Sequence, residues 1–192
     1  MKKLAFTLPA LALFACSGEE DDPQTVFFEN LSALCGQSFT GELVSDDTAD
    51  AELQGQPMIM HVRECSIDEI RIPFHIGEDR SRTWVITRDD SGLTLKHDHR
   101  HEDGSEDVLT QYGGATADEG TATRQEFPAD YFSKDLFTRE GIEVSTANVW
   151  AVEVMPGETF AYELNRPNRH FRAEFDLSAP VDTPPPPWGA DE

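Results

Sequence analysis

Three histidines at alternate positions are the residues of this chain that are best placed to do chemistry. They are His97, His99 and His101. They lie within residues 94–114, TLKHDHRHEDGSEDVLTQYGG, a stretch that predicts two β-strands folded back across a turn at Asp103-Gly104. Because successive side chains of a strand point to opposite faces, the imidazoles share the face that Leu93 and Leu95 begin. We therefore expect them to continue the core side of the strand toward the hairpin tip.

Two interpretations of this hairpin differ in their chemistry. Imidazoles two residues apart on a strand can reach one metal ion, and a carboxylate on the return strand can complete the set. The metal hypothesis, a divalent-metal protein or metal-dependent enzyme, uses four ligands: His97, His99, His101 and Glu106. The alternative, which the position near a hairpin tip favours, is that the polar side chains pair across the hairpin without a ligand.

No other motif in the sequence indicates catalysis. It contains neither a nucleophile elbow nor a glycine loop that would hold a phosphate at a helix N-terminus. Acidic residues are so numerous that no pair of carboxylates can be singled out as acid and base. The sequence therefore predicts no cofactor other than the divalent metal of the histidine hairpin, and it favours a protein that is not an enzyme.

The N-terminus has the pattern of a secretory signal, residues 1–15. Two lysines precede an apolar run that is too short to span a bilayer, and Cys16 follows it. The segment Leu13-Phe14-Ala15-Cys16 resembles the lipobox of bacterial lipoproteins. This resemblance implies cleavage before Cys16, acylation of that cysteine by chains such as palmitate, and, because Ser17 is not aspartate, an outer-membrane lipoprotein facing the periplasm or the cell exterior. The alternative is an ordinary signal cut near Cys16.

With Cys16 lipidated, one pair of cysteines is left, Cys35 and Cys65. An even pair in an oxidising compartment predicts a disulfide, and neither cysteine belongs to a C-x-x-C motif that would indicate metal or redox chemistry. We therefore predict a Cys35–Cys65 bond.

The charge of the chain restricts its partners. There are 37 acidic and 15 basic residues, which give a net charge of −22. Such a field repels nucleic acid and anionic lipid surfaces. We therefore expect no nucleic acid, attachment to the membrane only through the N-terminal lipid, and complementarity to a basic protein partner.

Apolar periodicity predicts one all-β domain. An acidic tether covers 16–25, a single domain 26–178, and a proline-rich disordered tail 179–192. Within the domain, strand-like alternation predicts eight to ten strands, and helical spacing predicts short helices within 26–35 and 128–141. His61, His75 and His170 alternate with apolar neighbours and are expected on solvent-facing strand positions. The alternating aromatic residues late in the chain are expected in the core.

The order of short helix, long antiparallel meander and late helix resembles that of lipocalin-like, or calycin, barrels. The resemblance implies a barrel interior that can hold a small apolar ligand. A jelly-roll or cupin-like sandwich is the alternative fold, because Gly92, His99, His101, Glu106 and Gly113 fall in the order of a cupin metal motif. The segments GQSFTGELV and MHVREC are also similar to a family of secreted bacterial proteins to which no activity is assigned.

Three functions remain open from the sequence. The first, which we favour, is a noncatalytic, lipid-anchored module of the cell envelope that binds a small ligand or a partner protein. The second is the metal-dependent protein of the histidine hairpin. The third is a purely structural envelope lipoprotein whose acidic surface meets a basic partner.

Overall fold

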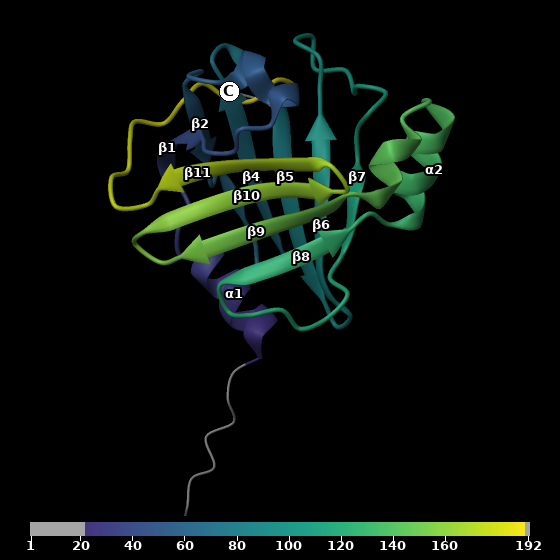
Figure 1. The fold of residues 1–192 in the computed structure, drawn as a ribbon. Coiled ribbons are helices and arrows are strands. Elements are labelled where there is room, and N and C mark those ends of the chain that lie inside the picture. Colours follow the sequence, from purple (N-terminus) through teal and green to yellow (C-terminus); the bar gives the residue numbers. More distant parts are fainter. Residues whose placement is uncertain (1–21, 191–192) are drawn as a thin grey trace, which may run out of the picture.

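Residues 22–190, which the computed structural model describes, form one antiparallel sheet that curves into a nearly closed barrel (Figure 1). Hydrogen-bonded neighbours follow the order β7-β6-β5-β4-β2-β1-β11-β10-β9-β8, and the short β3 pairs with β4 beside this path. The expected all-β, antiparallel barrel with a few short helices is confirmed. The segment predicted to be a signal sequence, Cys16 and most of the predicted tether lie outside the described residues.

The strands are β1 Ser38–Leu43, β2 Met58–His61, β3 Glu64–Cys65, β4 Glu69–Ile76, β5 Asp79–Asp89, β6 Gly92–His99, β7 Tyr112–Ala115, β8 Arg124–Pro128, β9 Val149–Met155, β10 Thr159–Arg166 and β11 Arg169–Asp176. The helices are α1 Pro23–Ser32 and α2 Tyr131–Arg139, and two 3-10 helices are η1 Thr48–Leu53 and η2 Glu143–Ala147. None of the helices in the described part of the chain is long and apolar enough to cross a membrane.

Aromatic side chains fill much of the barrel interior. Trp84 stacks on Phe74 at 4.7 Å and on Tyr162 at 4.5 Å between ring centroids, and Phe160 and Phe175 pack around them. Pairs of this kind stabilise a core by about 0.5–1.5 kcal/mol beyond the burial of apolar area. The expectation that the alternating aromatic residues of the late strands form the core is correct for all four, Phe160, Tyr162, Phe171 and Phe175, which are buried.

Helix α1 closes one end of the barrel (Figure 1). Its apolar side chains Phe27, Phe28 and Leu31 are buried in the core. The helix begins earlier than its apolar spacing predicts, because the Asp22 carboxylate caps it by accepting a hydrogen bond from the Thr25 N–H at 2.9 Å, and Pro23 fits its first turn.

A disulfide joins the segment after α1 to the sheet. It links Cys35 to Cys65 of β3, with the two Cα atoms 6.3 Å apart, as the sequence predicts. Next to it, the Gly36 N–H donates to the Val62 carbonyl oxygen at 2.7 Å. Together these bonds hold the helix-containing end of the chain on the barrel.

The two edges of the sheet, β7 and β8, meet at the start of α2. The Asp130 N–H donates to the Gly113 carbonyl oxygen at 2.9 Å. The Ser133 hydroxyl donates to the same oxygen at 2.8 Å and accepts from the Gly113 N–H at 2.7 Å. Gly114 allows this approach, because a Cβ there would lie only 2.9 Å from the Pro128 carbonyl carbon. We call this contact the barrel seam.

The tail that the sequence predicts to be disordered is held against the barrel over its described residues. The Val181 N–H donates to the Ser38 carbonyl oxygen at 2.8 Å. Further on, Arg80 of β5 donates to the Pro186 carbonyl oxygen at 2.9 Å and accepts from the Trp188 N–H at 3.1 Å. Proline repeats look disordered because they cannot form helix or sheet hydrogen bonds, but their carbonyl groups still accept.

Replacing Gly114 with alanine should loosen the barrel seam. The added methyl group meets backbone atoms on both sides of Ala129, so the strands must move apart, and we expect a loss of about 1–3 kcal/mol in the free energy of unfolding. Urea denaturation followed by circular dichroism measures it. Ala115→Ser, at the exposed next position of β7, is the matched control. Equal stability of Gly114→Ala and the control would contradict the assignment of the seam.

Candidate functional site

An aromatic pocket lies at the end of the barrel away from α1. It has a volume of about 180 Å³. The two ends of β6 show that α1 and the pocket lie at opposite ends of the barrel. Gly92, at the start of the strand, lies against Gln24 of α1, whereas His99, at its end, lines the pocket. We call the pocket the mouth.

The walls of the mouth come from strands on both sides of the barrel. Trp84 of β5 and Tyr162 of β10 lie stacked in it, and Tyr112 of β7 and Phe171 of β11 line its sides. These side chains are interior positions of their strands, so the same alternation that fills the core also forms the pocket. The interior beyond the mouth is occupied by other aromatic rings, which limits its depth.

His97 lies buried behind the mouth, with both ring nitrogens in use. Nδ1 lies 3.0 Å from the Tyr112 carbonyl oxygen and Nε2 lies 2.7 Å from the Tyr162 hydroxyl. Because a carbonyl only accepts, Nδ1 carries the proton and the Tyr162 hydroxyl donates to Nε2. Burial, with a smaller effect from His99, lowers the pKa of His97 to about 3. The neutral imidazole therefore orients the Tyr112 backbone and the Tyr162 ring, both of which shape the mouth.

His99 and Arg82 lie next to each other across β5 and β6 and line the mouth. Burial and then the charge of Arg82 lower the pKa of His99 to about 4, so this ring is also neutral near pH 7. The hydrogen bonds of Arg82 to Asp79 and Ser81 both use Nη1. Its Nε and Nη2 groups have no hydrogen-bond acceptor among residues 22–190.

The 3-10 helix η1 is fixed at the mouth by an ion pair. Nη1 and Nη2 of Arg169 each donate to one oxygen of Asp50 at 2.6 Å, and Asp50 is only 4% exposed. Such a two-pronged pair holds both side chains in one geometry. It places Leu53, the last residue of η1, in the pocket lining.

The four residues of the metal hypothesis separate in the structure. His97 and His99 do follow Leu93 and Leu95 on the inner face of β6. His101, in contrast, is exposed, with Nε2 3.9 Å from Asp107.

Glu106 also faces away from the mouth, toward Arg100 and Gln111. Within residues 22–190, no group of three or more histidine, cysteine or acidic side chains is placed to hold a metal ion. The geometry therefore gives the metal hypothesis no support. Strand β6 ends at His99, so the alternation that would place His101 on the same face as His97 and His99 does not continue.

Of the three histidines expected to face solvent, His170 does, His61 of β2 is only partly exposed, and His75 does not. His75 of β4 is 4% exposed, and burial, followed by the charge of Arg80, lowers its pKa to about 4. The expectation holds for His170, which is exposed and hydrogen-bonded to the Asn165 side chain at 2.7 Å. Alternation identifies the outer face of a strand, but it does not show what covers that face.

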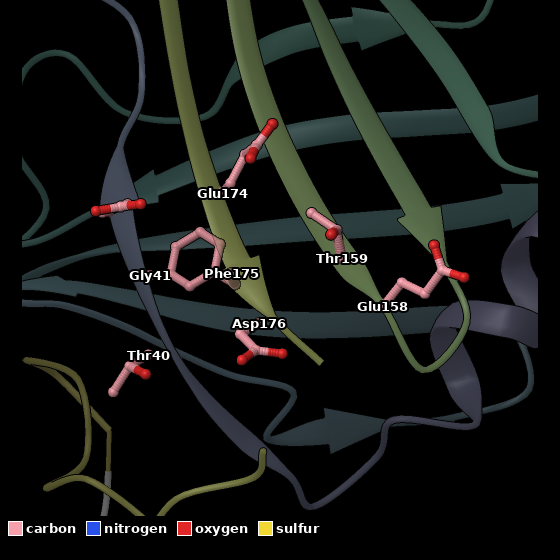
Figure 2. Close-up of a pocket in the computed structure, with 8 residues that line it drawn as sticks. Thr40, Gly41, Glu158, Thr159, Glu174, Phe175 and Asp176 are labelled. Carbon is pink, nitrogen blue, oxygen red and sulfur yellow. The ribbon is translucent and has the colours of Figure 1, made fainter. Parts of the chain in front are cut away.

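A second hollow, of about 380 Å³, is acidic and open. It is lined by carboxylates of β1, β11 and the β9–β10 turn: Glu42, Glu158, Glu174 and Asp176. Figure 2 shows that the labelled carboxylates spread around the Phe175 ring without converging on one point. The acidic lining of this hollow therefore reflects the overall negative charge of the chain, and its carboxylates are not arranged as ligands for one cation.

The largest ionic cluster in the described chain is satisfied internally. Arg124 and Arg172, on the outer face of β8 to β11, share Glu153 and Glu163 between them. Although burial alone would raise it, hydrogen bonds from Arg124, Asn165 and Arg172 lower the pKa of Glu163 to about 2. Each charge has a partner, so this cluster stabilises the sheet.

The sequence interpretation missed most of the mouth. It placed histidines at this end of β6 but did not include Arg82, Trp84 or Tyr162. Their signal was present, because Arg82, Trp84 and Ile86 share one face of β5 and Arg82 is the charged residue at the end of that apolar row. The pattern could not show that β5 pairs with β6, or that closure of the barrel places Tyr162 of β10 against Trp84 of β5.

Comparisons with known proteins do not add to this description. No family model, curated protein or solved structure matches the chain.

Acid should destabilise this protein through its buried histidines. Unfolded histidine has a pKa of about 6.5, whereas the pKa is about 3 for native His97 and about 4 for native His75 and His99. Between pH 6.5 and 4 the unfolded chain therefore binds protons that the native state does not, so the free energy of unfolding falls as pH falls, by at most about 1.4 kcal/mol per pH unit for each site.

Urea titrations at several pH values measure this slope. His97→Gln should remove about one histidine's share of it, and His101→Gln, at an exposed position, should not change it. If the two variants show the same slope as the unmodified protein, His97 is not held neutral by the fold.

Proposed function

We propose that the protein is a lipid-anchored, noncatalytic module of the cell envelope that binds a small ligand at the mouth of its barrel. The observation that carries this proposal is the aromatic pocket of about 180 Å³ with polar groups at its edge. Pockets that bind small molecules combine apolar walls with a few placed polar groups in this way.

The size of the mouth limits the ligand. An apolar cavity of about 150 Å³ in another protein accepts benzene, so a pocket slightly larger than this admits one ring with a short substituent. A small aromatic or apolar group fits best, because aromatic and aliphatic side chains line most of the mouth; Trp84 and Tyr162 stack on each other at 4.5 Å and form its floor.

The state of the two histidines supports binding over acid–base catalysis. His97 uses both ring nitrogens within the protein, and its burial keeps it neutral. A general base needs a pKa near the working pH, and the pKa values of His97 and His99 lie well below neutrality. Their arrangement suits the positioning of aromatic rings.

The lipid anchor belongs to the same proposal. The segment around Cys16 resembles a lipobox, and α1, which the tether precedes, lies at the end of the barrel opposite the mouth (Figure 1). Anchoring at Cys16 would leave the mouth accessible to solvent.

Single-ring probes should bind at the mouth. We would add benzyl alcohol, benzamide or benzoate to ¹⁵N-labelled protein and follow amide shifts by NMR. We expect shifts at the mouth, around Trp84, Tyr112 and Phe171. Leu53→Trp should fill the pocket and abolish them, whereas Ile67→Trp, at a position 79% exposed, should not. If none of the probes shifts mouth residues at millimolar concentration, the binding proposal fails and a structural envelope role becomes the better explanation.

Cys16→Ser should prevent lipidation. Mass spectrometry of the N-terminal peptide of the protein expressed in a bacterial host should show an acylated Cys16 in the unmodified protein. The serine variant should lack the acyl mass and move from the membrane to the soluble fraction. An unmodified Cys16, or cleavage at another position, would contradict the anchor.

A further inference from the structure

We infer that the ligand of the mouth is a small aromatic monocarboxylate whose carboxylate pairs with Arg82. This inference rests on the proposed function, because it specifies the chemistry of a ligand that binds at the same pocket. Three features of the mouth carry it: the free donors of Arg82, the charge balance of the lining, and the neutral histidine beside the arginine.

The Arg82 guanidinium is placed to receive an anion. Arg82 and Trp84 share one face of β5, and both side chains line the mouth. Asp79 and Ser81 contact only Nη1. Nε and Nη2 form one edge of the planar guanidinium, and this edge matches the two oxygens of a carboxylate.

The charges around the mouth favour an anion at this point over a cation. The pocket lining contains two arginines and one acidic residue, Asp50. Both oxygens of Asp50 are bound by Arg169, so they are not available to hold a cation. Asp79 balances part of the charge of Arg82 through Nη1, so in a chain of net charge −22 it is the Nε and Nη2 edge of Arg82 that an anion can approach.

His99 adds a second contact and a dependence on pH. Its ring lines the mouth across from Arg82, and its Nε2 lies 3.4 Å from the Tyr112 hydroxyl. Burial and then Arg82 lower the pKa of His99 to about 4, against the opposing effect of the Asp107, Asp79 and Asp98 carboxylates. A bound carboxylate would favour the protonated ring and raise this pKa, so binding would take up a proton and strengthen as pH falls.

The aromatic part of the ligand follows from the walls. The lining is mostly aromatic and aliphatic, with Leu53, Tyr112 and Phe171 among its residues, and the volume of about 180 Å³ excludes long acyl chains. A single ring bearing one carboxylate would contact the apolar lining, fit the volume of the mouth and pair with Arg82.

Benzoate and benzamide test the inference, because they have nearly the same shape and differ in charge. We would measure both dissociation constants by NMR titration at pH 7 and pH 5.5. We expect benzoate to bind roughly tenfold more tightly than benzamide, with the preference increasing at pH 5.5. Arg82→Gln should remove the preference, because it weakens benzoate binding far more than benzamide binding, and Arg82→Lys should keep part of it. Arg139→Gln, on the exposed face of α2, is the control for net charge.

The outcomes separate the two proposals. If neither compound binds at the mouth, the proposed function itself fails. If both bind there with equal affinity, or if Arg82→Gln keeps the preference for benzoate, the mouth binds rings but Arg82 does not select a carboxylate, and the inference is overturned. Loss of the extra preference at pH 5.5 in His99→Gln, with the preference at pH 7 retained, is expected from the role given to His99.

Discussion

The structure depends on bringing the two edges of one curved sheet together at the barrel seam. An open edge would expose unpaired backbone groups, and the protein meets this constraint with a glycine pair, a serine and the start of a helix. The same closure fixes Tyr112, the residue before Gly113. Its carbonyl oxygen then accepts from His97, and its ring stacks on that imidazole at 4.5 Å and lines the mouth. The seam is therefore a structural element and also one wall of the candidate site.

The interior of the barrel and the outer face of its sheet differ in how their polar groups are charged. Inside, the histidines are neutral and bound to tyrosines, which suits an apolar core. Outside, arginines of β8 and β11 each join several carboxylates of neighbouring strands. A chain with 37 acidic and 15 basic residues has few cations to distribute. Arg124 and Arg172 lie where neighbouring strands carry carboxylates side by side, and their positive charges limit the repulsion between those carboxylates.

The sequence predicted the elements more fully than their contacts. Alternation along β4, β6, β10 and β11 was clear, and it placed His97 and His99 on the inner face. It could not show that the strand would end at His99, which separates His101 and Glu106 from the mouth. Nor could it show that the tail would lie on the barrel or that His75 would be covered, because both depend on contacts between residues far apart in the chain.

The position of α1 has a consequence for how a ligand would arrive. The chain enters the barrel at its closed end, and the mouth lies at the other end of the same strands. A protein anchored to a membrane by its N-terminus would turn the closed end of its barrel toward that membrane. Exchange would then take place with the aqueous phase, since a molecule dissolved in a bilayer would have to leave it and travel the length of the barrel. If the anchor and the ligand site proposed above are both correct, this geometry favours a ligand that is soluble in water over one that is taken up directly from lipid.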